Sequence, residues 1–427
     1  MSRVSIRVLG GGHEVGRAAI AVKVGDSSKY LLLDYGVNFN ERDEPQLPLH
    51  IRPSDLAGLV VTHAHLDHVG AAPLLYTTAK LPAVMTLLTK NLSEIMVKDF
   101  LKISSYYLPF DDLSLKTLMD NTIDLNYGDE VRVDRYYIKL INAGHIPGSA
   151  MAYVEVDGVK ILYTGDVNTI DTRLVKKPSI EGLEADILII ESTYGNANHP
   201  PRSLIEKEFI ESIKEVIESG GNVLIPAFSL GRSQEILTLL YEKMPWAHVF
   251  YDGMIRTINN IILSHPEYVN RYDLLANAIS NFKIVRGTSD RKKIVKGKEN
   301  VIVASAGMLK GGPAVYYLKK LMDDPNNAVF LVSFQGPSTP GRKLLEDGVL
   351  SESNELVRAR VQWFDFSSHA GSDGLLWIVN HVKNVKDVVI IHGELSSCEA
   401  LKKRITNVRD DVKVHVPSNG TEISIEI

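Results

Sequence analysis

The chain opens with a series of short apolar runs, and five such runs along its length end on an acidic or histidine side chain. Runs such as VSIRVL, AIAVKV and ILIIEST are typical of short β-strands. The residues that follow five of them are Asp34, His63, Asp166, Glu191 and His392. Because the strands of a packed sheet deliver the residues after them to one edge, we expect these side chains to gather at a single site.

The pattern of the sequence changes near residue 200. Before it, helical spacing is sparse and predicts helices only over 92–103 and 113–120. After it, strands and helices alternate. Ser203 and Glu206 have the spacing of a capping box and predict the start of a helix, and a second helix is predicted after Gly231.

The later apolar runs NVLIPAF, KIVR, ENVIVASA and NAVFLVS are typical of buried parallel strands. Shorter strands return towards the C-terminus. The expected division of the chain is therefore 1–195, 200–355 and 361–427.

Composition excludes several classes of protein. Charged residues make up 23% of the 427 residues and the net charge is −5, so bulk charge gives no argument for a nucleic-acid partner. Cys398 is the only cysteine, which excludes an internal disulfide and suits the reducing cytoplasm. No run approaches the roughly 18 apolar residues of a membrane span. The lysine-rich stretch 291–300 is interpreted as a solvated loop, with an RNA contact as the alternative.

The motif THAHLDHVG places four ligand-type side chains within six residues: His63, His65, Asp67 and His68. Imidazole and carboxylate without thiolate suit zinc in an open catalytic site. Alternate residues of an extended stretch point the same way, so His63 and His65 can share one metal. The other two can then reach a second ion on the following turn. The alternative is a histidine-rich surface turn.

A two-metal site needs further ligands and a bridge. His145 and Asp166 supply a third nitrogen and a bridging carboxylate, and His392 can complete the second ion. The glycine-rich start LGGGHEVG does not fit a dinucleotide fingerprint, because the third glycine falls at Gly16, one residue too late, and a strand rather than a helix follows. A tight hairpin that brings residues 11–13 near the metal edge is expected instead.

These motifs, with YTGD, resemble the nuclease branch of the metallo-β-lactamase fold. ESTYG, IPAFSLGRSQEIL, ASAGML, SFQGPSTPGRKLL, FSSHAG and IIHGE are similar to the β-CASP subfamily, which includes the cleavage and polyadenylation specificity factor endonuclease, its archaeal relatives and ribonuclease J. The resemblance covers essentially the whole chain. It implies an α/β fold: an αββα sandwich over 1–195 and 361–427, with an inserted β-CASP α/β domain over 200–355, and no N-terminal KH module.

The resemblance also implies a role for each site residue. It implies two zinc ions per chain, held by seven ligands: His63, His65 and His145 on the first, Asp67, His68 and His392 on the second, and Asp166 as the bridge. Asp34 would orient a ligand histidine. The catalytic residues are Asp67, His369 as general acid and Glu191, which orients His369. Ser367, Ser368, Gly231 and Arg232 are candidates for phosphate contacts, with cap and turn roles as the alternative.

The function implied is a zinc-dependent ribonuclease of single-stranded RNA, with 5′-to-3′ exonucleolytic decay or processing ahead of endonucleolytic cleavage of the mRNA 3′-end type. A small-molecule hydrolase of the same core fold and a scaffold without metals are the alternatives. The roughly 155-residue insertion disfavours the first alternative, and the filled ligand positions disfavour the second. We expect a cytoplasmic homodimer with no membrane partner.

Overall fold

The computed structural model describes residues 3–104, 107–350 and 353–427, and the chain forms two compact units. The first unit contains the chain up to Asp171 together with residues 176–198 and 368–427. The second unit contains residues 172–175 and 199–367.

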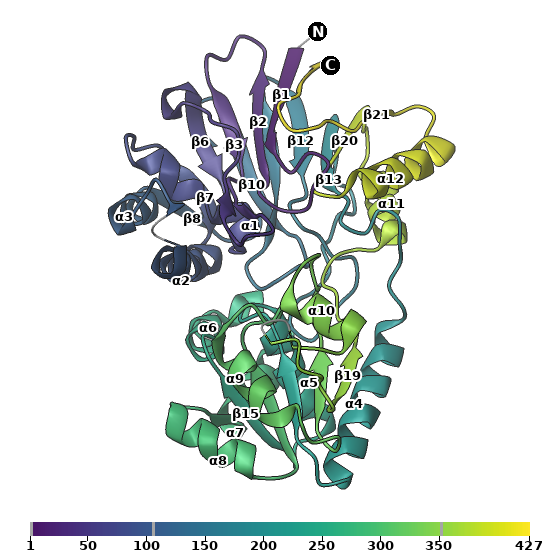
Figure 1. The fold of residues 1–427 in the computed structure, drawn as a ribbon. Helices are drawn as coiled ribbons and strands as arrows, with labels where there is room; N and C mark the ends of the chain where they lie inside the picture. The colour runs from purple at the N-terminus through teal and green to yellow at the C-terminus, as the bar shows by residue number, and fades with distance from the viewer. Residues whose placement is uncertain (1–2, 105–106, 351–352) are drawn as a thin grey trace. The chain divides into compact units, whose positions relative to one another are not determined.

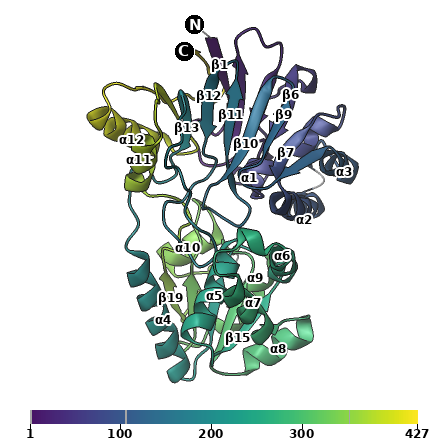
Figure 2. The same ribbon diagram turned by 180° about the vertical axis from the view of Figure 1, so that it is seen from behind.

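Two seven-stranded sheets form the centre of the first unit (Figures 1 and 2). The first sheet runs in the order β22 (Glu422–Glu426), β1 (Arg3–Gly10), β2 (Ala19–Val24), β3 (Tyr30–Leu33), β6 (Leu56–Val60), β7 (Ala83–Thr86) and β8 (Thr122–Leu125). The second runs in the order β21 (Lys413–His415), β20 (Asp387–Ile391), β13 (Ile187–Glu191), β12 (Val159–Tyr163), β11 (Ala150–Val156), β10 (Tyr136–Asn142) and β9 (Glu130–Val133). The short strands β4 (Asn38–Phe39) and β5 (Pro45–Gln46) pair separately.

Strand alternation explains why the sequence runs are apolar throughout. In β13, Ile187 and Ile189 point into the core between the two sheets, whereas Leu188 and Ile190 pack under the helices on the outer face. Side chains on successive strand residues point to opposite faces, so a sheet covered on both faces needs apolar residues at every position.

Helices cover the outer face of each sheet and complete the αββα sandwich that we predicted. The first sheet is covered by α1 (Leu66–Val69), α2 (Leu87–Ser104) and α3 (Asp112–Asp120), and the second by α11 (Ser372–His381) and α12 (Leu395–Val408). Helices α2 and α3 include the two predicted helical segments, and α2 begins five residues earlier than its prediction, at Leu87.

The second unit is a parallel six-stranded sheet between two layers of helices. Its strands are β16 (Lys283–Ile284), β15 (His248–Asp252), β17 (Asn300–Ala304), β14 (Val223–Pro226), β18 (Ala328–Leu331) and β19 (Arg360–Trp363), in that order. Its helices are α4 (Arg202–Glu218), α5 (Arg232–Lys243), α6 (Ile255–Leu263), α7 (Tyr272–Asn281), α8 (Thr288–Lys296), α9 (Gly312–Leu321) and α10 (Pro340–Asp347). Because β19 pairs with β18, the unit extends to Ser367, beyond the expected boundaries at 355 and 361.

The capping box predicted at Ser203 does not form. Helix α4 begins one residue earlier, at Arg202, with Pro201 before it and no side-chain cap. The carboxylate of Glu206 accepts a hydrogen bond from Arg173 instead of the helix amide. A long-range ion pair therefore takes the side chain that the local pattern assigned to the cap.

The interpretation of the lysine-rich stretch 291–300 as a loop is wrong. Most of it lies in α8, which is preceded by Gly287 and followed by Gly297. Ile294 is buried among the residues packed against β17, and this anchor fixes the segment as a helix. Val295 is partly buried against the same cluster, and the lysines project from the exposed side, so the high charge concealed a short apolar face.

Residues 172–175 leave the first unit and pack into the second. The Arg173 guanidinium donates to the carboxylates of Glu206 and Glu242. The buried carboxylate of Glu235 accepts hydrogen bonds from the backbone amides of Arg173, at 3.4 Å, and Leu174, at 3.0 Å. The second unit is therefore closed by a short segment that lies between β12 and β13 in the sequence.

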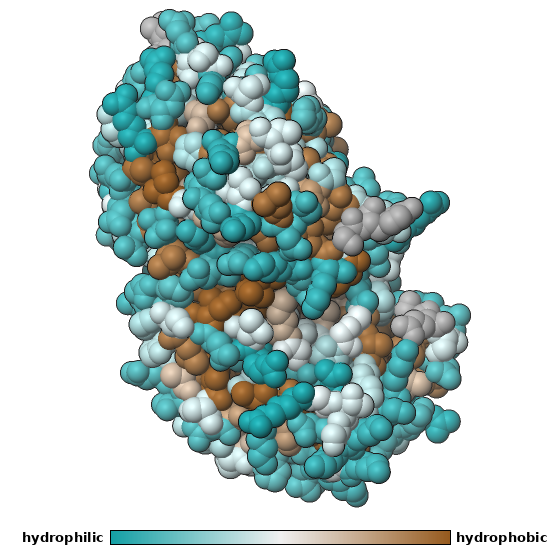
Figure 3. Space-filling model, turned by 90° about the vertical axis from the view of Figure 1, so that its left-hand side faces the viewer, coloured by the Kyte–Doolittle hydropathy of each residue, from teal (hydrophilic) through white to brown (hydrophobic). Residues whose placement is uncertain are grey.

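In the part of the chain that the structure describes, no helix has the length and apolar character needed to cross a membrane. Exposed large apolar side chains include Ile103, Leu113, Trp246 and Leu356. On the face shown in Figure 3, apolar residues form several patches separated by hydrophilic ones.

Candidate metal centre

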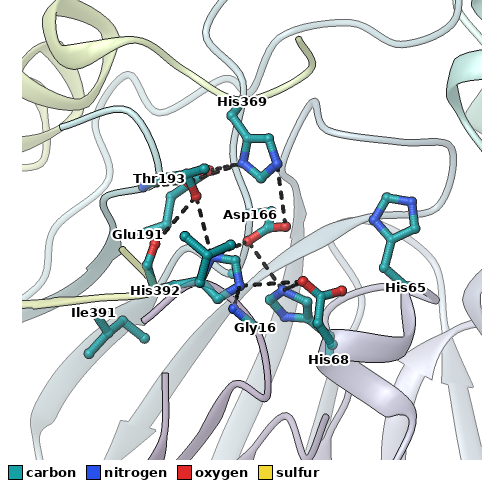
Figure 4. A network of polar contacts seen from close by, with 12 residues as sticks. Gly16, His65, His68, Asp166, Glu191, Thr193, His369, Ile391 and His392 are labelled. Atoms are coloured by element: carbon teal, nitrogen blue, oxygen red, sulfur yellow. Dashed lines mark hydrogen bonds and ion pairs between the residues drawn. The ribbon is translucent and has the colours of Figure 1, made fainter. Parts of the chain in front are cut away.

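The expected site residues meet at the ends of strands from both sheets of the first unit (Figure 4). Asp34 and His63 follow the parallel strands β3 and β6 of one sheet. Asp166, Glu191 and His392 stand at the carboxyl ends of the parallel strands β12, β13 and β20 of the other. The sequence predicted one sheet edge; the structure has two such edges, which converge on the same point.

Four side chains form the first donor group: His63, His65, His145 and Asp166. The His65 Nδ1 atom lies 3.2 Å from the Nε2 atoms of both His63 and His145. Asp166 Oδ2 lies 3.6 Å from each of the same two Nε2 atoms. One carboxylate oxygen and three imidazole nitrogens therefore surround one small space.

The second donor group uses the other oxygen of Asp166. Asp166 Oδ1 lies 3.2 Å from His68 Nε2 and 3.3 Å from His392 Nδ1. Asp67 Oδ2 completes the group at 3.5 Å from His392 Nε2. Asp67 stands in α1 and its side chain is 32% exposed, whereas the other three side chains of the group are buried.

Hydrogen bonds fix the tautomers of three histidines. His68 Nδ1 donates to Asp34 at 2.8 Å, and His145 Nδ1 donates to the carbonyl of Ser368 at 2.9 Å. The Thr62 hydroxyl donates to Asp34, so it accepts from His63 Nδ1, 3.1 Å away. In each ring the Nε2 lone pair is left facing the donor groups, which is the tautomer that a metal requires.

The electrostatics of the two groups differ. Burial is the main factor that lowers the pKa values of His63, His65 and His145, so these rings are neutral and their lone pairs are available. Burial acts in the same direction on His68, but the carboxylates of Asp166, Asp34 and Asp67 outweigh it and raise its pKa. The pKa of Asp166 is lowered because nearby histidines outweigh its burial. A cation can replace the proton on His68.

Asp34 is held by three hydrogen bonds besides the one from His68. It accepts from the backbone amide and hydroxyl of Thr62 at 2.7 and 2.8 Å, and from the Tyr163 hydroxyl at 2.8 Å. Its φ of 58° is uncommon for a non-glycine residue, although aspartate tolerates it better than most. The geometry is that of a carboxylate that orients a ligand histidine.

We expect Asp34→Asn to lower metal affinity by about 10- to 100-fold, because the amide can turn a donor towards His68 Nδ1 and disturb its tautomer. Isothermal titration with zinc measures the change. Asp134→Asn is the matched control, since Asp134 is exposed and has a similar φ of 53°. Unchanged zinc affinity in the Asp34 variant would contradict this role.

Glu191 and His369 form a pair beside the donor groups. His369 Nδ1 lies 3.0 and 3.1 Å from the two carboxylate oxygens of Glu191, and Nε2 lies 3.9 Å from Asp166 Oδ2. Glu191 is itself fixed by the backbone amide of Val167 at 2.8 Å. Burial lowers the pKa of His369, but Glu191 and Asp166 outweigh it and raise that pKa to about 9. The imidazole therefore carries a proton at neutral pH.

The four candidate phosphate contacts are divided between the two units. Ser368 lies in the first unit, and its carbonyl accepts from His145. Ser367, Gly231 and Arg232 belong to the second unit, where Gly231 precedes α5 with φ of 84°. A phosphate role for these residues stays a prediction.

Residues 11–18 form the connection between β1 and β2, which pair as an antiparallel hairpin. His13 is not in the metal-capable groups found among the described residues; its ring lies 3.1 Å from the carbonyl of Val416. The Gly16 amide donates to His392 Nε2 at 3.1 Å, and the Gly11 carbonyl accepts from the His392 amide. The loop therefore packs against His392 and positions that side chain.

Sequence reasoning missed Thr62, Tyr163, Gly16 and Gly36. Thr62 and Tyr163 stand inside the THAH and YTGD motifs, directly before ligand segments, and that adjacency is the signal that could have found them. Gly36 has no such signal. A Cβ at Gly36 would lie 1.7 Å from the Asp67 carbonyl oxygen, so only glycine lets the two backbones pass this closely.

The donor sets fit zinc. Two ligands of a tetrahedral zinc ion, with bonds of about 2.0–2.2 Å, stand roughly 3.3–3.6 Å apart. The separations of 3.2 and 3.6 Å in the first group match this closely. In the second group, His68 Nε2 and Asp166 Oδ1 are buried atoms that make no hydrogen bond, and a cation would satisfy both.

An αββα sandwich that carries such a histidine and carboxylate cluster defines a metal-dependent hydrolase. Family models match the chain over three ranges: the metallo-beta-lactamase superfamily over 21–227, the Beta-Casp domain over 233–344, and the Zn-dependent metallo-hydrolase RNA specificity domain over 355–417. The chain belongs to the β-CASP family of the metallo-β-lactamase superfamily, which confirms the resemblance seen in its motifs.

Similar proteins come from archaea. RNase aCSPSF2 of Saccharolobus solfataricus is 48% identical, over 98% of this chain and 85% of the relative. The RNase J-like protein of Methanocaldococcus jannaschii is 32% identical, over 99% of this chain and all of the relative. Transcription termination factor FttA of Pyrococcus abyssi is 34% identical, over 92% of this chain and 67% of the relative. A crystal structure of a protein of unknown function from Enterococcus faecalis V583 shares the fold, with a TM-score of 0.65 and 14% sequence identity. The match covers 99% of this chain and 100% of that protein.

Proposed function

We propose that this chain is a zinc-dependent ribonuclease that hydrolyses phosphodiester bonds of single-stranded RNA. The observation that carries the proposal is Asp166, which turns one carboxylate oxygen to each of two donor groups. A carboxylate shared in this way is typical of two-metal sites that act on phosphate esters. The names of the archaeal relatives support RNA as the substrate.

Each donor group would hold one zinc ion. His63, His65 and His145 would bind the first, Asp67, His68 and His392 the second, and Asp166 both. When bound, zinc supplies positive charge that acidifies water and offsets the charge of a phosphate. The protein keeps these ligands buried and correctly protonated: Asp34 orients His68, and Ser368 orients His145.

His369 is proposed as the general acid. Glu191 fixes Nδ1 of the ring, so the proton on Nε2 is directed towards the donor groups. In hydrolysis that leaves 5′-phosphate and 3′-hydroxyl ends, water attacks phosphorus, the bond to the 3′-oxygen breaks, and that oxygen takes the proton from His369. Glu191 stabilises the imidazolium before transfer, as a carboxylate does beside a catalytic histidine.

We propose 5′-to-3′ exonucleolytic cleavage as the mode, with endonucleolytic cleavage as the alternative. The test is a time course on single-stranded RNA labelled at the 5′ or the 3′ end, with 5′-monophosphate and 5′-triphosphate substrates compared. Immediate release of a labelled mononucleotide from the 5′ end, blocked by triphosphate, supports the exonuclease. Discrete internal fragments that are indifferent to the 5′ end support the endonuclease.

The Asp67→Ala protein, purified in the same way, is the control for contaminating nuclease. We expect it to be inactive, because Asp67 is a member of the second donor group. Absence of RNA cleavage by the intact protein loaded with zinc would overturn the proposal and favour a small-molecule hydrolase.

A further inference from the structure

Positive charge is concentrated in one short segment of the second unit. Residues 283–298 carry seven lysine or arginine side chains and one carboxylate, a net charge of +6, within a chain whose net charge is −5. The segment forms β16, the turn after it, and α8. Helix α8 packs against α9, and Figures 1 and 2 show it at the end of this unit.

Lys283 of this segment lies over the Phe250 ring, whereas the lysines of α8 and of the turn after it are exposed to solvent. Arg291 binds Asp252 through two hydrogen bonds of 2.7 and 3.0 Å, so its charge is neutralised within the protein. By contrast, among the described residues no carboxylate pairs with the four exposed lysines of the helix and the turn after it. Those four are Lys292, Lys293, Lys296 and Lys298, and we call them the α8 lysines.

Their arrangement opposes the stability of the free helix. Lys292 and Lys296 are four residues apart, and Lys293 and Lys296 are three apart, so like charges face each other on the helix surface. The helix dipole favours cations in the last turn, where Lys293 and Lys296 stand, but this effect is small. A polyanion seated across these side chains would relieve the repulsion.

The chemistry of the surface indicates which kind of partner it binds. The apolar anchor of α8, Ile294, is buried in the core of the unit, so the helix has no free apolar face to insert into a lipid bilayer. A protein interface would need an apolar or aromatic centre. The exposed residues of α8 and of the turn after it are polar or charged, and the one exposed large apolar side chain of residues 283–298 is Ile284 of β16. A phosphodiester chain requires only cations at intervals.

We propose that the α8 lysines bind the phosphate backbone of single-stranded RNA, as a site additional to the metal centre. The proposal rests on the ribonuclease function for the identity of the polyanion. It gives the chain sequence-independent affinity for RNA through side chains that take no part in the chemistry.

The test is equilibrium binding of a labelled oligouridylate of about 30 nucleotides. The protein carries Asp67→Ala so that the RNA is not cut, and Lys292→Gln, Lys293→Gln and Lys296→Gln are combined in it. Glutamine keeps helix propensity close to that of lysine. The matched control combines Lys102→Gln, Lys116→Gln and Lys403→Gln, three exposed lysines of the first unit.

We expect the α8 variant to bind about tenfold more weakly than the control at low salt, with a salt dependence of log Kd that is shallower by about 2, since each lost phosphate contact on a single strand contributes about 0.7. A Kd and slope equal to those of the control would overturn the proposal. Loss of binding to phosphatidylserine vesicles with RNA binding unchanged would also overturn it, in favour of a membrane surface.

Cleavage by the intact enzyme is measured separately. A protein that binds RNA through the α8 lysines but does not cut it would contradict the ribonuclease function and still support this binding surface. Cleavage by the intact enzyme, together with unchanged RNA affinity in the α8 variant, would support the ribonuclease function and overturn this binding surface.

Discussion

Asp166→Asn is expected to lower RNA cleavage by at least about 1,000-fold and to reduce the zinc content of the chain. The substitution keeps the shape of the side chain but replaces one of two anionic oxygens with an amide. Asp166 is the only residue shared by both donor groups, so the change affects both at once. Zinc per chain by plasma mass spectrometry and turnover of labelled RNA are the two measurements.

Asp134→Asn is again the matched control, because it removes one exposed carboxylate from the same unit. Circular dichroism checks that the Asp166 variant is folded. Wild-type zinc content and turnover in a folded Asp166→Asn protein would show that this carboxylate is not the bridge.

His369→Ala is expected to lower turnover by about 100- to 10,000-fold while the zinc content stays unchanged. The residue is not one of the seven expected ligands: its Nδ1 contacts Glu191, although its ring centroid lies 4.6 Å from that of the candidate ligand His145. Loss of the proton donor should therefore slow the chemical step without emptying the metal sites. Single-turnover cleavage of labelled RNA and zinc analysis measure the two effects.

Added imidazole distinguishes a proton donor from a structural residue, because it can occupy the space left by the ring and restore the rate. The control is His381→Ala, which removes an exposed histidine from α11. A His369→Ala protein that loses zinc, or that imidazole does not rescue, would contradict the assignment as general acid.

Much of the first unit follows from local pattern. A strand such as β13 is apolar on both faces because it lies between the inter-sheet core and the outer helices, and that arrangement leaves the run ILIIE in the sequence. Glu191 is the last residue of this strand, so it stands at the sheet edge where the site lies. Strand ends and the THAHLDHVG motif therefore predicted the position of the site before any tertiary contact was known.

What local pattern could not predict depends on contacts between distant residues. Ser203 and Glu206 have the spacing of a capping box, but Arg173, some 30 residues earlier, takes the glutamate. The expected hairpin placed residues 11–13 near the metal edge, but the hydrogen bond from Gly16 to His392, 376 residues away, has no local signal. Helix α8 has one fully buried residue, Ile294, so its sequence shows no apolar repeat at helical spacing and looks like a charged loop.

The segment 172–175 has a consequence for protein engineering. A graft of residues 199–367 into another scaffold would omit the donors that satisfy Glu235, whose side chain is only 4% exposed in the intact chain. An unsatisfied buried carboxylate costs on the order of 1–3 kcal/mol or more. Glu206 and Glu242 would also lose Arg173. The transplantable module is therefore discontinuous, and a faithful graft has to carry a copy of the tetrapeptide TRLV with it.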